Sequence, residues 1–486
     1  MMTAFSRLRM RWRNFVYVFT APFLYACSGD ANVFTVLGAP PALAIRSIQA
    51  LPNNPLGARV QPWAKGSSQI RVAYTGADLS GTEFTPWQSP DSSVVVLGLA
   101  AGRTYTMRIQ SQSNDQPIDG SVLEYRAPQL PPGLAQVGIA LAGTFSGGYS
   151  MAPIAGLDGH GYLIIFDSLG TIRWYRDFGP HTVSATTQQE DGHITAFVGA
   201  SDGFNMSSGV YVEVNPAGDS VRAVTAAGSP YTDPHELLES FDRLGNRRAD
   251  YLFGYDFRAF DRTAVGGGPA DTFAVHQVLR ITAAGTVDTL ISGLEHWSVT
   301  DDVSPGVLAD LDHPNSIDFD LDGQVVVSYR DLSSVVKVNR RTHAFEWVLG
   351  GTHNQFTFID DPLGGFDSQH TARILPNGHL MVFDNGWSHS PRASRAVEYA
   401  LDTAAKTATM VWQYSANPPI FNDFTGSAQR LANGNTAVAF TQKGTVDEVR
   451  ADGTLMGRAT LVKAPGQVAQ PYRVTRITSL YYYARP

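Results

Sequence analysis

The stretch FDSQHTARILPNGHLMVFDNG, residues 366–386, contains two short apolar segments that meet at an Asn-Gly pair. Asn-Gly favours the tight turn of a β-hairpin, so this stretch predicts two antiparallel strands. His370 stands where the first strand begins. Two upstream stretches, LDHPNSIDFDLDGQVVVSYR and DPHELLESFDRLGN, place His313 and His235 at a similar distance before their own turn glycines. The same residue therefore recurs at the same place in three units.

Turn glycines recur along the chain beyond residue 136. The first unit has Gly159 or Gly161, and the later units turn at Gly192, Gly245, Gly323, Gly378 and Gly434. The last two intervals, of 55 and 56 residues, suit units of four strands, and six such units can close into a ring without free edges. The longer interval before Gly323 indicates an insertion around AFDRTAVGGGPADTFA. We predict a six-bladed β-propeller over residues 136–486, with a β-sandwich or a second small barrel as the alternative fold.

The composition favours an all-β protein of more than one domain. The chain has 486 residues, of which 43% are hydrophobic, with 46 glycines and 28 prolines, and this profile is rich in turns. Residues 31–128 hold short alternating strands such as SQIRVAYT and TYTMRIQSQ. They predict a small β-sandwich of the fibronectin or immunoglobulin kind. The proline-rich stretch APQLPPGLA, residues 127–135, separates the two predicted domains.

The first residues have the order of an export signal: four arginines, an apolar run and a small-residue segment that ends at Cys27. The run is short for a membrane-spanning helix, which needs about 20 residues. Cys27 is the single cysteine, so no internal disulfide is possible, and LYAC, residues 24–27, resembles a bacterial lipobox. We predict that residues 1–26 are a signal peptide, that Cys27 is lipidated and that the protein is an exported, periplasmic or cell-envelope lipoprotein held at a membrane. An uncleaved anchor or an ordinary signal cut nearby is the alternative.

The charge excludes one class of partner. Loss of residues 1–26, which hold four arginines and no acidic residue, changes the formal net charge from −8 to −12. Affinity for phosphate backbones depends on clustered cations, so we expect no nucleic-acid partner.

Strand geometry predicts where the three histidines point. In a propeller blade the start of the first strand and the end of the second strand lie at the same face. His235 and His313 stand ten residues before their turn glycines, and His370 stands eight residues before its own. Seven residues after the turn glycines, at the ends of the second strands, stand Arg330, Asn385 and Thr441. We therefore expect all of these side chains at one channel mouth.

Several chemistries are compatible with such a cluster. A ladder of polar side chains that binds water is the structural interpretation. A metal site is another, since neutral imidazoles bind zinc and copper, but the sequence has no HExxH or HxH pattern and Arg330 would repel a cation. A pyrroloquinoline cofactor is a weaker interpretation, because the sequence shows no tryptophan repeat to bind it. An anionic substrate fits best, because Arg330 offers a fork of donors to sulfate or phosphate while a neutral histidine supplies a nucleophile.

A family resemblance adds to this reading. The motifs DHPNSIDFD, VVVSYRDLSSVVKVN, FEWVLGG, SQHTARIL, MVFDNG, SRAVEYALD and MVWQYS occur in the order and approximate spacing of bacterial aryl-sulfate sulfotransferases, which work without the nucleotide sulfate donor. The resemblance spans about residues 230–450. The amino-terminal region with PNNPLGA is also similar to the first domain of that family.

The resemblance implies a six-bladed propeller that takes a sulfuryl group from an aryl sulfate onto a histidine and passes it to a phenolic acceptor by a ping-pong mechanism. His370 in SQHTA matches the nucleophile that forms the sulfohistidine. His313 in DHPNS and Arg330 in SYRDLSS match residues that hold the sulfuryl oxygens and support the leaving phenolate. His235 in DPHEL matches the remaining active-site histidine, and Asn315 is a weaker match that helps to orient or bind the substrate. Neither a metal nor a diffusible cofactor is expected, and a homodimer is consistent with the resemblance.

Two other functions compete with the transferase. A surface-anchored propeller would bind its ligand in the channel without turnover. An aryl sulfatase would use water as the acceptor and release free sulfate.

Overall fold

The computed structural model describes residues 43–113, 116–201, 207–302 and 309–481. Its regular structure is almost entirely strand, so the all-β prediction is confirmed. Within these ranges the helical elements are α1 (Gly293–His296) and two 3₁₀ turns, Thr263–Val265 and Thr441–Lys443. None of the helices described there has the length and apolar character needed to cross a membrane. The predicted signal peptide and Cys27 lie outside the described residues.

Two antiparallel sheets form the amino-terminal part of the described chain. The first has the order β1 (Leu43–Ala50), β2 (Ala58–Ala64) and β5 (Val94–Val96). The second has the order β4 (Glu83–Phe84), β3 (Ile70–Gly76), β6 (Thr104–Ser113) and β7 (Gln116–Arg126). Side chains from both sheets, among them Ile45, Val60, Val72 and Ile109, share one buried cluster. A common core between two sheets is what a β-sandwich requires, while the proposed boundaries of that domain stay a prediction.

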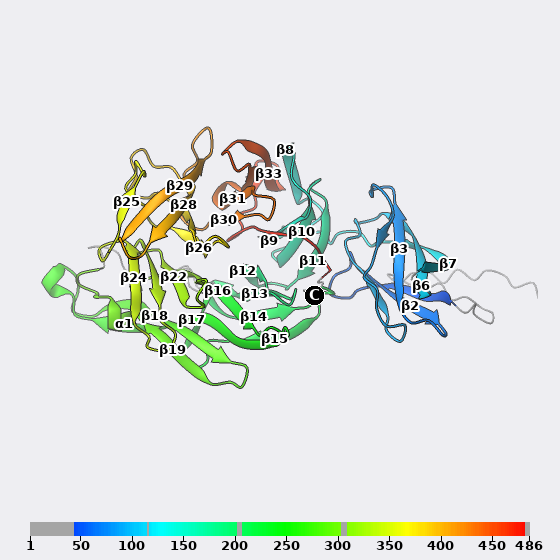
Figure 1. The fold of residues 1–486 in the computed structure, drawn as a ribbon, viewed down its shortest axis with the longest axis horizontal. Helices are drawn as coiled ribbons and strands as arrows, with labels where there is room; N and C mark the ends of the chain where they lie inside the picture. The colour runs from blue at the N-terminus through cyan, green and yellow to red at the C-terminus, as the bar shows by residue number, and fades with distance from the viewer. Residues whose placement is uncertain (1–42, 114–115, 202–206, 303–308, 482–486) are drawn as a thin grey trace, which may run out of the picture. The chain divides into compact units, whose positions relative to one another are not determined.

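Six further sheets follow along the chain, in the colour order from teal to red in Figure 1. The first sheet contains β9 (Tyr149–Ala155), β10 (Gly161–Asp167), β11 (Ile172–Asp177) and β35 (Thr475–Ile477). The second contains β12 (Thr182–Gln188), β13 (Ile194–Ser201), β14 (Ser207–Val214) and β15 (Ser220–Val224). The third contains β16 (Tyr231–Phe241), β17 (Arg247–Phe260), β18 (Asp271–Thr282) and β19 (Val287–Ser292). The fourth contains β21 (Pro314–Phe319), β22 (Val325–Tyr329), β23 (Ser334–Val338) and β24 (Phe345–Gly350). The fifth contains β26 (His370–Ile374), β27 (Leu380–Asp384), β28 (Arg395–Asp402) and β29 (Thr407–Ser415). The sixth contains β30 (Ser427–Arg430), β31 (Thr436–Phe440), β32 (Thr445–Val449) and β33 (Leu455–Ala464).

Short strands extend three of these sheets. β20 (Ala309–Asp310) pairs with β18, and β25 (Thr357–Ile359) pairs with β29. Both β8 (Gly138–Gly143) and β34 (Gln467–Val468) pair with β33.

One edge strand of each sheet contacts the corresponding strand of the next sheet. The contacts run from β35 to β12, then to β16, β21, β26 and β30, and from β30 back to β35. β35 takes the edge position beside β9, to which it pairs antiparallel. The strand that completes the first sheet therefore comes from the carboxyl-terminal end of the described chain.

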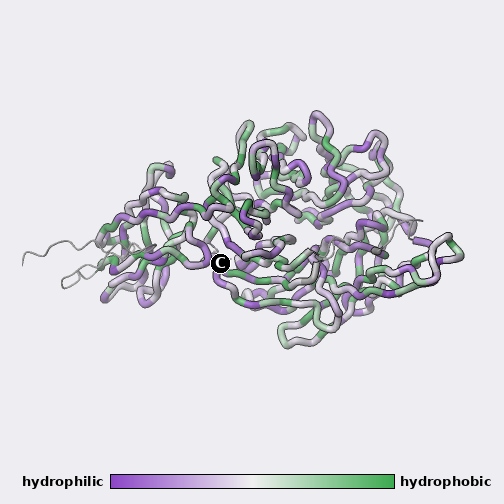
Figure 2. Tube along the Cα trace, turned by 180° about the vertical axis from the view of Figure 1, so that it is seen from behind, coloured by the Kyte–Doolittle hydropathy of each residue, from purple (hydrophilic) through white to green (hydrophobic). Residues whose placement is uncertain are grey.

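Apolar side chains fill the space between each pair of neighbouring sheets. Six buried clusters each combine residues from two successive sheets, and one of them joins the last sheet to the first through Ala439 and Ile164. Strands such as β22 and β27 are buried at every position because both faces of their sheets are covered. Figure 2 shows the resulting apolar segments as green stretches within the strands.

The predicted turn glycines occupy the hairpins that the sequence indicated. Gly192, Gly245, Gly323, Gly378 and Gly434 all have positive φ and lie between the first and second strands of their sheets. Gly159 also has positive φ, but it lies between β9 and β10, which are the second and third strands because β35 takes the first position. The first unit is therefore offset by one strand from the others.

The longer interval before Gly323 contains two additions. β17 and β18 form an extended hairpin whose tip, with the turn Thr263–Val265, falls in the stretch where an insertion was predicted. A second addition, which the sequence did not indicate, carries α1 and leads to β20.

The pairing of β35 with β9 gives a stability prediction. Ile477 is 6% exposed and packs in a cluster with Met151 and Leu163. We expect Ile477→Ala to lower the free energy of unfolding by about 2–5 kcal/mol, because the lost contacts leave a cavity at the closing strand. Urea unfolding monitored by circular dichroism measures this change. The control Val411→Ala, at a site 48% exposed, should change it by less than about 0.5 kcal/mol; equal effects of the two variants would show that β35 does not close the fold.

Candidate active site

A cavity of about 260 Å³ gathers the predicted histidines. Its walls include His235, His313, Arg330 and His370 together with Thr182, Ser184, Pro234, Phe424, Thr425 and Tyr472. His235 lies in β16, His313 directly precedes β21, Arg330 directly follows β22, and His370 begins β26. Three successive sheets thus each contribute a histidine from the start of their first strand, as the hairpin geometry predicted.

The backbone at this cavity is held in an uncommon conformation. His313, Thr371 and Thr425 have φ values of 50°, 53° and 61°, in the left-handed region that residues with a Cβ seldom adopt. Such strain persists only where the surrounding structure imposes it, and it is concentrated at functional sites. These residues therefore have side-chain directions that regular strands would not give.

The hydrogen bonds of His370 fix its tautomer. Its Nδ1 lies 2.7 Å from Oδ1 of Asn385, and Nδ2 of Asn385 donates to the carbonyls of Asn422 (2.6 Å) and Thr425 (3.0 Å). Because the amide nitrogen is used by two acceptors, the amide oxygen faces the imidazole and accepts from Nδ1–H. Nε2 consequently carries a lone pair, to which the backbone N–H of Thr425 donates at 3.2 Å.

The surroundings of His370 keep the ring neutral. The residue is 2% exposed. Burial, followed by the positive charge of Arg330, holds the pKa of His370 well below its ordinary value. At neutral pH the Nε2 atom therefore carries no proton.

Carboxylates hold the other two histidines. Nδ1 of His235 lies 2.8 Å from Asp233, and Nδ1 of His313 lies 2.8 Å from Asp310. A carboxylate only accepts, so both rings donate from Nδ1 and leave Nε2 for the cavity. The two rings meet edge to face with centroids 4.7 Å apart.

The two rings differ in charge. Burial lowers the pKa of His235, and Asp233 only partly offsets that effect. Burial also acts on His313, but Asp310 and Asp331 outweigh it and raise the pKa of His313. The site thus combines two imidazoles of lowered pKa, on His235 and His370, with one of raised pKa on His313.

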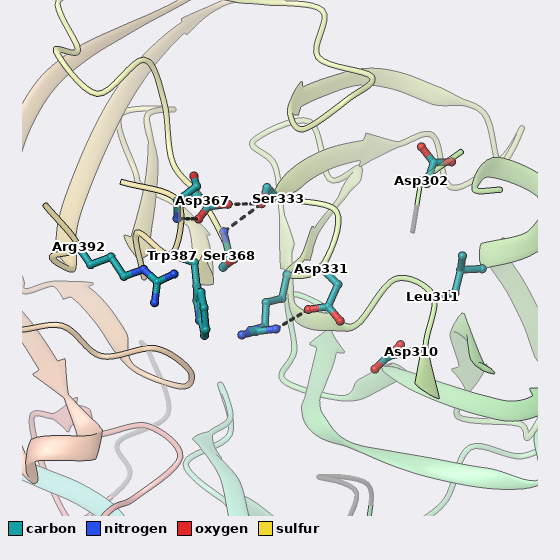
Figure 3. Close-up of a pocket in the computed structure, with 11 residues that line it drawn as sticks. Asp302, Asp310, Leu311, Asp331, Ser333, Asp367, Ser368, Trp387 and Arg392 are labelled. Carbon is teal, nitrogen blue, oxygen red and sulfur yellow. Dashed lines mark hydrogen bonds and ion pairs between the residues drawn. The ribbon is translucent and has the colours of Figure 1, made fainter. Parts of the chain in front are cut away.

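Arg330 connects this cavity to a second one. Its guanidinium is paired with Asp331 and donates to the carbonyl of Asp423 at 3.3 Å. A neighbouring cavity of about 550 Å³ also has Arg330 in its wall, together with Trp387 and Arg392. Figure 3 shows Arg392 beside Trp387, and its guanidinium carbon lies 4.3 Å from the indole centroid. Arg330 is therefore reachable from a larger, polar and partly aromatic opening.

Two other predicted residues have supporting positions. Asn315 is fully buried and is not among the residues that line the cavity; its amide donates to the carbonyl of Gln369 at 2.7 Å. It thus holds the residue before His370, and direct substrate contact stays a prediction. Thr441 contacts Thr425 through their hydroxyls at 2.6 Å.

The sequence reasoning missed four residues at the site. Asp233 precedes His235 by two positions and Asp310 precedes His313 by three, so a carboxylate shortly before each repeated histidine was an available signal. Tyr472 lines the cavity and meets the His235 ring at a centroid distance of 5.5 Å. His276, which contacts both aspartates, lies on β18 outside the repeat positions. No local pattern pointed to Tyr472 or His276.

Within the described residues, three groups of side chains have the spacing to hold a metal ion. Two of them belong to this site: His276 with Asp310 and Asp312, and His313 with Asp310 and Asp331. In both groups a histidine nitrogen is already at hydrogen-bonding distance from a carboxylate oxygen, 2.8 Å in each case. A proton between the two atoms accounts for such distances without an ion.

Comparisons of the whole chain give no close relative. No curated protein sequence matches it significantly. A solved structure of a Bacteroides caccae protein of unknown function is 13% identical, covers 69% of this chain and 100% of its own, and has a TM-score of 0.41. A streptogramin B lyase structure is 11% identical, covers 66% of this chain and 87% of its own, and has a TM-score of 0.36.

A family model gives the assignment. The model described as Arylsulfotransferase (ASST) matches residues 298–463. The matched segment contains His313, Arg330 and His370, with Phe424 and Thr425, so it includes five of the ten residues that line the cavity, and it also contains Asn385, the partner of His370. The resemblance predicted from the sequence motifs is confirmed over this segment: residues 298–463 match the arylsulfotransferase family model.

Proposed function

We propose that this protein is an aryl-sulfate sulfotransferase that moves a sulfuryl group from an aryl sulfate to a phenolic acceptor through a sulfohistidine on His370. One observation carries the proposal. Within the segment that matches the family model, the neutral ring of His370 lines a cavity that also holds Arg330 and His313, whose pKa is raised. A nucleophile beside a fixed cation and a histidine that favours its protonated form is the arrangement that transfer of an anionic group needs.

The fold supports this placement of the site. We propose that the six sheets are the blades of a six-bladed propeller, since their edge strands contact one another in a closed sequence. The cavity then lies at the mouth of the central channel. A ping-pong mechanism requires that the first phenol leaves this cavity before the acceptor binds.

In the first half-reaction, Nε2 of His370 gives up the hydrogen bond from the N–H of Thr425, and its lone pair attacks the sulfur of the aryl sulfate. The S–N bond forms as the bond between sulfur and the phenolic oxygen breaks, and the proton on Nδ1 stays on the ring, held by Asn385. His313 gives its Nε2 proton to the departing phenolate. Arg330 faces the charge that spreads over the three sulfuryl oxygens in a loose transition state, by analogy with phosphoryl transfer.

In the second half-reaction, the oxygen of an acceptor phenol attacks the same sulfur. His313, now neutral, takes the phenolic proton while the S–N bond breaks, and His370 returns to its neutral form with the proton on Nδ1. The two half-reactions are the reverse of each other for different phenols. Neither step uses a nucleotide sulfate donor, a metal or a cofactor.

The cellular location is a separate proposal that rests on the sequence. Four arginines, an apolar run and Cys27 support export and lipidation at Cys27. We propose a periplasmic or cell-envelope lipoprotein whose donor and acceptor are small aryl compounds. Labelling of the expressed full chain with a radioactive fatty acid, compared with Cys27→Ser, tests the anchor.

Replacing the nucleophile tests the proposal directly. In His370→Asn, formation of a covalent sulfuryl adduct from 4-nitrophenyl sulfate should fall below detection, because the amide offers no lone pair in place of Nε2. Intact-mass spectrometry of residues 28–486, without acceptor, measures the adduct. His379→Asn is the control, since His379 lies at the opposite end of the same hairpin and pairs with Glu398. An adduct of normal yield in His370→Asn would exclude His370 as the nucleophile.

The fate of the adduct separates the competing functions. In the wild-type protein, added phenol should remove the sulfuryl group and yield phenyl sulfate. Release of free sulfate that phenol does not compete away would identify a sulfatase. Binding of the aryl sulfate with neither adduct nor nitrophenol would identify a binding protein.

The charge of Arg330 gives a pH prediction. After burial, this cation is the largest cause that lowers the pKa of His370. Arg330→Gln should raise that pKa, so Nε2 becomes protonated, and the rate of adduct formation falls, at a higher pH than in the wild type. Arg330→Lys keeps the positive charge, so the acid limb of its pH–rate profile should stay where it is in the wild type. Both variants lose the paired N–H donors of the guanidinium and should form the adduct about 100-fold more slowly. Stopped-flow release of nitrophenol measures the profiles. An acid limb that does not move in Arg330→Gln would contradict this assignment.

A further inference from the structure

His276 is a buried histidine that the proposed transfer steps do not use. It lies in the middle of β18 and its side chain is 2% exposed. Its Nδ1 lies 2.8 Å from Oδ1 of Asp312 and 3.4 Å from Oδ1 of Asp310, and its Nε2 lies 3.3 Å from Oδ2 of Asp233. Both ring nitrogens therefore face carboxylate oxygens.

The same carboxylates hold the cavity histidines. Asp233 turns Oδ2 to His276 and Oδ1 to Nδ1 of His235 at 2.8 Å. Asp310 turns Oδ1 to His276 and Oδ2 to Nδ1 of His313 at 2.8 Å. A continuous chain of polar contacts thus runs from His235 through Asp233, His276 and Asp310 to His313, with His276 at its centre.

The geometry favours a charged ring. Nδ1 lies at hydrogen-bonding distance, 2.8 Å, from Asp312, Nε2 lies at ion-pair distance from Asp233, and an ionised carboxylate only accepts. Burial by itself would lower the pKa of His276, but Asp310 and Asp312 outweigh burial and raise it well above the ordinary value. The other groups that face the ring are Asp233 and Tyr255, whose centroid lies 5.4 Å away.

The cation in turn offsets the negative charge of the carboxylates. Burial would raise the pKa of Asp233 and Asp310, yet the histidines beside them lower both. Without the imidazolium, three buried carboxylates, on Asp233, Asp310 and Asp312, would lose the cation that they share. That arrangement is costly in a medium of low polarity, where a buried charge needs a partner.

We propose that His276 is a positioning residue of the transfer site: its imidazolium fixes Asp233 and Asp310 so that each of them holds a cavity histidine with Nε2 directed at the substrate. This inference rests on the proposed function, because it assigns His276 to the same reaction. Residues one step removed from reacting groups orient those groups and fix their tautomers, and their replacement typically reduces activity by about 10- to 100-fold.

The test compares His276→Gln with His193→Gln. Gln fills similar space but carries no charge. His193 is a matched control, since it is also held by two acidic residues, Glu213 and Asp191, and is not among the residues that line the cavity. We expect His276→Gln to reduce kcat about 10- to 100-fold with little change in KM, and His193→Gln to leave both near the wild-type values.

The pH profile separates positioning from a general loss of stability. Removal of the cation leaves more negative charge beside His313 and raises its pKa, so the basic limb of the rate profile should move to higher pH in His276→Gln. His276→Lys, which restores a cation, should return the limb toward its wild-type position. A basic limb that stays in place in His276→Gln, or a kcat that falls only in proportion to the folded fraction, overturns the inference.

Two measurements on the wild-type protein test the inference even where these variants do not fold. With the network in place, His313 stays protonated above the ordinary histidine pKa of about 6.5, so a basic limb centred at or below that value overturns the inference. Loss of activity on chelation, restored by a divalent metal, would show that an ion and not a proton joins these residues, and it would also overturn it. In every case the adduct on His370 reports separately on the proposed function.

Discussion

The antiparallel pairing of β35 with β9 is the contact on which the remaining architecture depends. Each sheet packs its apolar faces against its two neighbours, so the first and last sheets would lose these contacts on one face if the sequence of sheets were left open. β35 also leads directly from Tyr472 and Arg473, and Arg473 donates to the carbonyl of His235 at 2.8 Å and pairs with Glu236. The segment that completes the first sheet therefore also braces a wall of the cavity.

The chemistry of the site follows from which atoms accept and which donate. The Nδ2 group of Asn385 donates to two backbone carbonyls, so its Oδ1 faces His370 and fixes the tautomer of that ring. Carboxylates fix the tautomers of His235 and His313 in the same direction. Three imidazoles thus present Nε2 to one cavity, but burial and Arg330 lower the pKa of His370 whereas Asp310 raises that of His313. Similar residues at equivalent repeat positions obtain different roles from their partners.

Local patterns predicted much of this arrangement. The turn glycines, the strands that follow them and the convergence of His235, His313 and His370 all follow from the period of the hairpins, because strand geometry fixes which end of each strand lies at a given face. The offset of the first unit could not be predicted in this way. Gly159 resembles the other turn glycines, and only the long-range pairing of β35 shows that it closes a different hairpin.

The sequence by itself determined the all-β class, the repeated unit, the resemblance to the arylsulfotransferase family and the set of histidines and arginine that line the cavity. Each of these depends on residues close together in the chain or on a regular spacing, and such information survives without a structure. The tertiary structure alone decided which partner each histidine has, that Tyr472 enters the cavity and that His276 joins two aspartates from different strands. Those contacts join residues far apart in sequence, and a histidine's charge depends on the burial and the neighbouring charges that such contacts create.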